Sequence, residues 1–188
     1  MTRQTIRDPQ TFTAEERSEY ESLVRARKPR PDGSIGGPFD PWLLNPELSH
    51  RLRGLGGMLW ERTSLDRGIV ELAISITGWY WKANVEWASH APRAVEYGIP
   101  QAVIDDVYAG RRPSGAEEHE LTYDVCMEMQ ANHRLPLSLY RRAVEAFGER
   151  GLAEMMAVIG YYTLVSMSLN AFEVEVAPGT KAPFEREP

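Results

Sequence analysis

The sequence predicts an all-α protein with one main domain. Proline and glycine divide its 188 residues into helix-sized segments, and no stretch shows the two-residue alternation of a half-buried strand. Residue pairs typical of helix N-termini precede several of these segments. The expected helices cover about residues 13–28, 46–61, 65–77, 83–97, 100–110, 114–132, 136–147 and 151–172.

The first expected helix begins at a capping box formed by Thr13 and Glu16, and it ends before Pro29. Residues 28–42, KPRPDGSIGGPFDPW, contain four prolines and three glycines, so we expect an extended loop there. Residues 1–40 are therefore interpreted as an N-terminal helix followed by a proline- and glycine-rich arm.

The second and third expected helices have recognisable starts. Asn45 before Pro46 is a favourable N-cap and first helical residue. Thr63 with Asp66 fits a second capping box, and Gly78 is the expected end of the mostly apolar helix that follows.

The fourth and fifth expected helices are bounded by the same kinds of residue. The fourth should bend near Pro92 and stop at Gly98. The fifth should begin at Pro100 and end at Gly110.

The last three expected helices follow in the same way. Ser114 with Glu117 fits a third capping box, and Pro136 is a suitable first residue for the next helix. The final helix, residues 151–172, is apolar around most of its circumference and needs cover on most sides. In a chain of this length we expect another subunit to supply part of that cover.

The composition excludes several classes of protein. With a net charge of −6, the chain should repel nucleic acid. The N-terminus lacks a secretory signal and no segment approaches the roughly 20 apolar residues of a membrane span, so we expect a cytoplasmic protein with no membrane partner. The single cysteine, Cys126, excludes an internal disulfide or a CxxC pair.

The segment ANVEWASH, residues 83–90, contains the candidate functional pair. Glu86 and His90 are four residues apart, so a helix would place both on one face within reach of each other. A carboxylate in that position can orient an imidazole and stabilise its charged form. The pair is therefore a candidate site for proton transfer.

Two longer segments carry a resemblance to a known family. The run RGIVELAISITGWYWKANVEWASHAPRAVEYGIPQAVIDDVYAGRRP and the later MMAVIGYYTLVSMSLNAFEV resemble the carboxymuconolactone decarboxylase family, whose other branch is the AhpD-like alkylhydroperoxidases. The resemblance covers about residues 40–176. It implies an AhpD-like helical domain over residues 41–176, a C-terminal tail over 177–188, and a homotrimer or homohexamer.

The resemblance also implies roles for individual residues. The redox branch carries a glutamate, then CxxC, then a histidine four residues after the second cysteine. In this chain Glu71 and His90 keep the outer positions, whereas Ala83 and Glu86 stand where the two cysteines would be. Peroxide reduction needs both thiols, so the chain is similar to the non-redox branch.

The hypothesis is a cofactor-free lyase-type enzyme of aromatic catabolism that moves a proton on a small carboxylic acid or lactone. His90 would be the acid and base, Glu86 would orient it, and Glu71 would supply a second carboxylate. Trp81 and Trp87 are candidates for lining the substrate pocket, and Arg67 and Arg93 for holding a substrate carboxylate.

Two alternatives remain open. The three acid and imidazole groups could bind a divalent metal, although two histidines at helical spacing would be stronger evidence. The chain could also be a non-enzymatic helical oligomer or ligand-binding protein that kept the fold without the redox chemistry. The sequence does not name a substrate.

Overall fold

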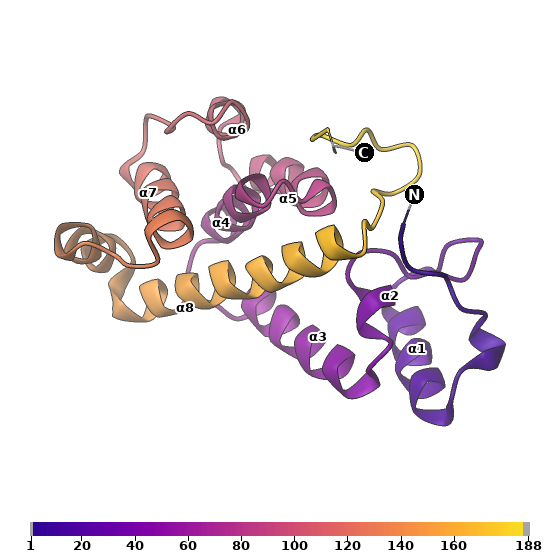
Figure 1. Cartoon of the computed structure of the whole chain (residues 1–188). Helices are drawn as coiled ribbons and strands as arrows, with labels where there is room; N and C mark the ends of the chain where they lie inside the picture. Colours follow the sequence, from indigo (N-terminus) through magenta and orange to yellow (C-terminus); the bar gives the residue numbers. More distant parts are fainter. Residues whose placement is uncertain (1, 186–188) are drawn as a thin grey trace.

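A computed structural model describes residues 2–185, and helices are the only regular elements in that part of the chain (Figure 1). The prediction of an all-α fold is therefore confirmed. The elements are η1 (Pro9–Thr11), α1 (Ala14–Ala26), α2 (Phe39–Trp42), α3 (Pro46–Glu61), α4 (Arg67–Tyr80), α5 (Asn84–Glu96), α6 (Gln101–Tyr108), α7 (Glu117–Asn132) and α8 (Leu137–Ala171).

The central element is α4, which packs mainly against α5 and also against α7 and α8 (Figure 1). All residues of α4 from Gly68 to Gly78 are buried, which matches its run of isoleucine, valine and alanine. A Cβ atom at Gly78 would lie 2.9 Å from the Cβ atom of Glu86. Only glycine therefore lets α5 approach α4 this closely, and this approach positions the candidate site.

The N-terminal arm has a small apolar cluster of its own. Leu23, Ile35 and Leu43 are buried there, apart from the main core. The expectation that residues 28–42 contain no helix is wrong for the last four, which form α2. Prolines are tolerated in this short helix because the N–H groups of a first turn have no partner within the helix.

Of the three expected capping boxes, one forms as predicted and the other two do not. Thr13 and Glu16 do form the reciprocal hydrogen bonds of a capping box. In α4, however, Asp66 is itself the N-cap and accepts from Gly68 N–H, so Thr63 takes no such part. Among the residues that the structure describes, no side chain caps helix α7, which begins at Glu117, and so the box predicted for Ser114 does not form.

The helix α8 breaks at Gly148, whose φ of 70° is not helical. The two parts correspond to the two helices expected at residues 136–147 and 151–172, and they run in different directions (Figure 1). By length and composition alone, α8 is apolar enough to cross a membrane. In the structure, however, it packs against α3, α4 and α7 as a core helix does.

The helix α5 continues across Pro92 to Glu96. Near the C-terminus, the chain folds back to the start of α5. The side-chain amide of Asn84 donates to the carbonyl oxygen of Phe184 at 3.1 Å and accepts from its N–H at 2.7 Å. Residues 186–188 of the expected tail lie outside the described residues.

Candidate proton-transfer site

The two carboxylates and the imidazole predicted from the sequence lie together in the core. Glu71 comes from α4, and Glu86 and His90 come from α5. Their exposed fractions are 0%, 4% and 7% respectively. Buried ionisable groups are costly unless they are paired, so this cluster needs either compensating contacts or a function.

Glu71 is held by hydrogen bonds to both of its oxygens. His90 Nδ1 lies 2.6 Å from Glu71 Oε2, and Trp60 Nε1–H donates to Glu71 Oε1 at 2.7 Å. Burial by itself raises the pKa of Glu71, but the hydrogen bonds from His90 and Trp60 and the charge on His90 bring it below its ordinary value. Glu71 is therefore an ionised hydrogen-bond acceptor.

This contact assigns the proton on His90. An ionised carboxylate can only accept, so His90 Nδ1 carries the hydrogen and donates it to Glu71. In the neutral imidazole the other nitrogen, Nε2, then carries a free lone pair. Nε2 lies 3.4 Å from Glu86 Oε2, in the i, i+4 arrangement expected from the sequence.

Glu86 is the less satisfied of the two carboxyl groups. Its Oε2 atom is buried and has no hydrogen-bond partner in the described part of the chain. Burial raises the pKa of Glu86; the charges of His90, Arg93 and Arg27 act in the opposite direction, whereas that of Glu71 adds to the rise. A raised pKa favours the protonated carboxyl, which can give a proton to Nε2 or to a substrate.

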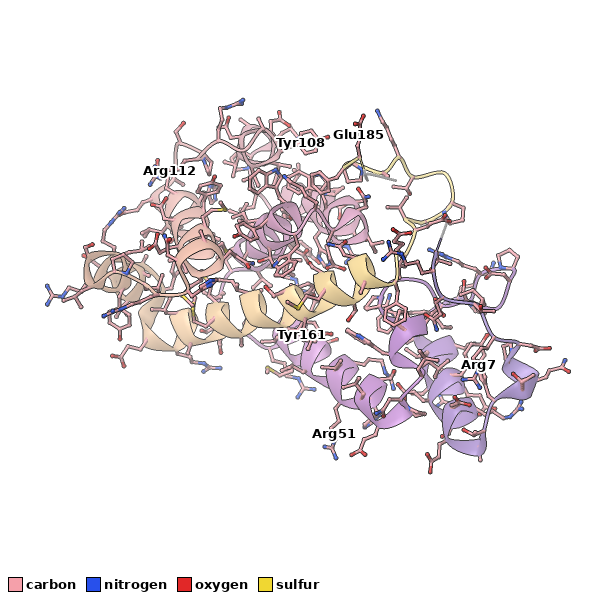
Figure 2. All side chains as sticks on the ribbon, in the orientation of Figure 1. Arg7, Arg51, Tyr108, Arg112, Tyr161 and Glu185 are labelled. Carbon is pink, nitrogen blue, oxygen red and sulfur yellow. The ribbon has the colours of Figure 1, made fainter. Side chains whose placement is uncertain are left out.

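Two tyrosines of α8 lie beside the histidine. The ring of Tyr162 packs edge to face against His90, with the centroids 5.3 Å apart, and Tyr161 packs against Tyr162 at 5.1 Å. Tyr161 extends from the underside of α8 in Figure 2. Burial raises the pKa of both phenols, as does the nearby carboxylate of Glu86. Both phenols therefore remain protonated and can serve as hydrogen-bond donors.

Of the two predicted arginines, Arg67 is attached to the Glu71 side. Its Cζ atom lies 3.6 Å from the centre of the Trp60 ring, and its Nε atom lies 4.0 Å from Glu71 Oε1. This stacking keeps Arg67 beside the indole that donates to Glu71. In this structure Arg67 therefore helps to hold Glu71 in place.

Arg93 lies on the Glu86 side. It is exposed and follows His90 by three residues and Glu86 by seven on the continuous helix α5, so the three share one face. Its charge lowers the pKa values of both Glu71 and Glu86. Arg93 is therefore placed where a substrate carboxylate could reach it from solvent.

The two predicted tryptophans point to other parts of the fold. Trp81 Nε1–H donates to Gln130 Oε1 on α7 at 3.1 Å. Trp87 packs against Tyr108 and Phe184, with ring centroids 5.4 and 5.9 Å away. These contacts join α4 and α5 to α7, α6 and the C-terminal segment, and a role of either indole in substrate binding stays a prediction.

The single cysteine lies away from the pair. Cys126 is buried on α7, and its Sγ atom is 4.0 Å from the carbonyl oxygen of Ala73. Burial raises the pKa of this thiol well above its ordinary value, so it stays protonated and unreactive at neutral pH. Ala83 is fully buried at the N-cap of α5.

Within residues 2–185, no group of three or more histidine, cysteine or acidic side chains is arranged to hold a metal ion. His90 Nδ1 and Glu71 are instead joined to each other by a hydrogen bond.

Solved structures show what the fold is similar to. One is the alkylhydroperoxidase AhpD core of an uncharacterized peroxidase-related protein from Ralstonia eutropha JMP134, with a TM-score of 0.74, 13% identity, and 94% of this chain and 93% of that chain covered. Another is an uncharacterized peroxidase-related protein from Silicibacter sp. TM1040, with a TM-score of 0.71, 12% identity, and coverage of 94% and 92%. The chain therefore has the AhpD-like fold.

Sequence comparisons add no name to this fold. No family model matches the sequence, and no curated protein matches it. At 12–13% identity the structural likeness shows the fold alone, so the chemistry of this chain has to be argued from its own site.

Several residues of the site were not found from the sequence. Trp60 and Tyr162 come from α3 and α8, and no local spacing connects them to the Glu86–His90 pair. Gly78 was expected only as a helix end, although it lies inside α4 at the contact with α5. A glycine within an otherwise bulky apolar helix was the one sequence signal for that contact.

Proposed function

We propose that the chain is a cofactor-free enzyme that moves a proton on a small carboxylic acid or lactone, as a carboxymuconolactone decarboxylase does. The observation that carries this proposal is the buried line Glu71–His90–Glu86. One carboxylate fixes the proton of Nδ1 at 2.6 Å, and the other carboxyl group faces Nε2 at 3.4 Å, with no hydrogen-bond partner for its buried Oε2 atom among residues 2–185.

Each of the three groups has a distinct task. Glu71 keeps His90 in the tautomer whose Nε2 lone pair is free, and it stabilises the imidazolium when that forms. His90 Nε2 is the base, and Glu86 is the acid that supplies or receives the second proton. A base and an acid thus lie side by side in one buried site.

For a decarboxylation, the balance of bonds is simple. The bond between the carboxylate carbon and the ring breaks, carbon dioxide leaves, and the electron pair remains on the substrate as a dienolate. The carbon then takes a proton from Glu86 or from the imidazolium, and solvent restores that proton. Isomerisation would use the same groups to remove a proton from one carbon and return it to another.

A proton-transfer test does not require the natural substrate. We expect the protein to catalyse exchange of the acidic C–H protons of unsaturated lactones and β,γ-unsaturated acids in D₂O, observed by proton NMR as loss of those signals. A parallel thermal-shift screen of the same compounds identifies ligands, because a ligand of the native state raises Tm. Exchange rates equal for wild type and His90→Gln across the whole panel would exclude this function.

A second candidate, a non-enzymatic ligand-binding or structural oligomer, is supported by one observation. His90 is only 7% exposed and Tyr162 packs against its ring, so the site is nearly closed within one chain. A binding protein would show a ligand-dependent rise in Tm without any proton exchange. The same two measurements therefore separate the two candidates.

A further inference from the structure

The end of the C-terminal segment is held by a group of four side chains that we call the aromatic clamp: Lys82, Asn84, Trp87 and Tyr108. Lys82 lies between α4 and α5, Asn84 and Trp87 belong to the start of α5, and Tyr108 is the last residue of α6. The ring of Phe184 lies in this clamp. It is stacked on Tyr108 and edge-on to Trp87, with both centroids 5.9 Å away.

The aromatic clamp also binds the backbone of the docked residues. The amide of Asn84 donates to the carbonyl oxygen of Phe184 at 3.1 Å and accepts from its N–H at 2.7 Å. The hydroxyl of Tyr108 donates to the carbonyl oxygen of Pro183 at 2.8 Å. In peptide recognition, hydrogen bonds to the main chain give affinity and contacts with the side chain give specificity. Both kinds of contact are present here.

Lys82 is held in an unusual backbone conformation within the clamp. Its φ is 50°, in the left-handed region where glycine is usual just after a helix. Its ammonium nitrogen lies 3.9 Å from the centre of the Trp79 ring and 5.2 Å from that of Phe184. Trp79 Nε1–H in turn donates to the carbonyl oxygen of Tyr108 at 3.0 Å. The walls of the clamp are therefore joined by contacts that do not involve the C-terminal segment.

The segment that leads to Phe184 lies on the surface. Val174, shortly after the end of α8, is buried. Residues 177–182 are all exposed, whereas Pro183 and Phe184 are partly covered. In Figure 1 the segment leaves α8 and turns back over α5. Pro183 and Phe184 thus dock at the end of an exposed connection, which gives a ligand an effective concentration in about the millimolar range.

We infer that the aromatic clamp is a peptide-recognition site for a Pro–aromatic dipeptide, and that Pro183 and Phe184 of the same chain are a tethered ligand that occupies it reversibly. Asn84 and Tyr108 bind the backbone of the dipeptide, whereas Trp87 and Lys82 contact its aromatic ring. This binding activity goes beyond the proposed function and does not depend on it.

The test uses a free peptide, acetyl-Lys-Ala-Pro-Phe-Glu-amide, which copies residues 181–185. It is titrated into the full-length Phe184→Ala protein, whose own C-terminal segment lacks the competing ring, and the indole N–H signals are followed by NMR. We expect a Kd of roughly 0.1–1 mM, as for a small ligand with a few hydrogen bonds. Wild type should bind the peptide about tenfold more weakly, because its tethered Phe184 competes at millimolar effective concentration.

Two further variants identify the binding groups. In the Phe184→Ala background, Asn84→Ala should weaken the peptide about tenfold or more, since it removes two of the three backbone hydrogen bonds. Tyr108→Phe keeps the ring and removes only the hydroxyl, so a loss of about threefold or more is expected. Asn132→Ala, at an exposed asparagine that ends α7, is the matched control and should leave the affinity unchanged.

A second peptide, with alanine in place of phenylalanine, should show no binding at concentrations up to about 10 mM, since it lacks the ring that the clamp contacts. Circular dichroism checks that all variants are equally folded. The inference is wrong if Phe184→Ala binds the phenylalanine peptide no better than wild type does. It is equally wrong if the two peptides bind alike, or if Asn84→Ala and Tyr108→Phe both bind as their parent does.

Discussion

Glu71 and His90 are 19 residues apart in the chain, yet Glu71 Oε2 lies 2.6 Å from His90 Nδ1 in the interior of the fold. The contact exists because α4 and α5 pack closely at Gly78, and it sets which nitrogen of the imidazole is free. The consequences of this pairing can be measured.

Glu71→Gln should impair both catalysis and stability. Glutamine has a single acceptor oxygen, whereas Trp60 Nε1–H and His90 Nδ1–H both donate to the present carboxylate. One buried donor is left without a partner, and we expect a loss of about 1–3 kcal/mol in the free energy of unfolding. Urea denaturation measures it, with the exposed Glu47→Gln on α3 as control.

His90→Ala should remove most of kcat, and Glu86→Gln should reduce it less. General acid and base groups contribute roughly 10²–10⁴-fold to the rate. In the proposed reaction His90 moves the proton itself, whereas Glu86 only supplies or receives the second proton. The measurement is the rate of C–H exchange or turnover, with assembly and folding checked first. A folded His90→Ala protein with the wild-type rate would make the Glu86–His90 pair a structural contact.

The stability of the Glu86→Gln variant relative to wild type should increase as pH rises. Burial raises the folded-state pKa of Glu86 above its ordinary value, so the native protein holds this proton more tightly than the unfolded chain does. The stabilisation that this bound proton gives the native protein is complete below the unfolded-state pKa of Glu86. It is lost as pH rises through the folded-state pKa. Glutamine has no such loss.

The corresponding measurement is the difference in Tm between Glu86→Gln and wild type from pH 4.5 upward. That difference should move in the positive direction as pH increases. A difference that stays constant with pH would show that Glu86 ionises normally in the folded protein, contrary to its buried and unpaired position.

The protein should lack dithiol peroxidase activity, and Cys126→Ser should leave any activity intact. The family resemblance places Ala83 and Glu86 where the redox branch has its two cysteines, and burial raises the pKa of the Cys126 thiol. A peroxide-consumption assay with a dithiol reductant tests this. Robust turnover that disappears in Cys126→Ser would contradict it.

We expect a homo-oligomer. Leu48, Leu55 and Met58 of α3 are 41–45% exposed, and Leu164 and Met167 of α8 are 37% and 51% exposed on a helix that contacts α3. Apolar surface of this kind is typical of subunit contacts.

Light scattering should give a multiple of the 21.3 kDa chain mass. Leu55→Glu and Met167→Glu should lower that mass, whereas Leu137→Glu, at an exposed position in the first part of α8, should not. A monomer at micromolar concentration in the wild-type protein would contradict the prediction.

Local sequence signals were sufficient to predict the elements whose causes are local. Capping at Thr13 and at Asn45 and the long apolar run of α8 were sufficient to predict helices there. The pairing of Glu86 with His90 was also predictable, because an i, i+4 spacing within one helix fixes the distance between two side chains. The position of Glu71 came from the family resemblance.

The groups that surround the Glu86–His90 pair are set by packing between helices, for which the sequence carries no local signal. The hydrogen bond of Trp60 to Glu71 and the packing of Tyr162 on His90 join side chains from different helices. Their spacing in sequence carries no information about distance, since side-chain packing between helices sets it. Packing between helices also places Trp81 against Gln130 of α7. The helix α2 within the proline-rich arm was likewise not predicted from the sequence.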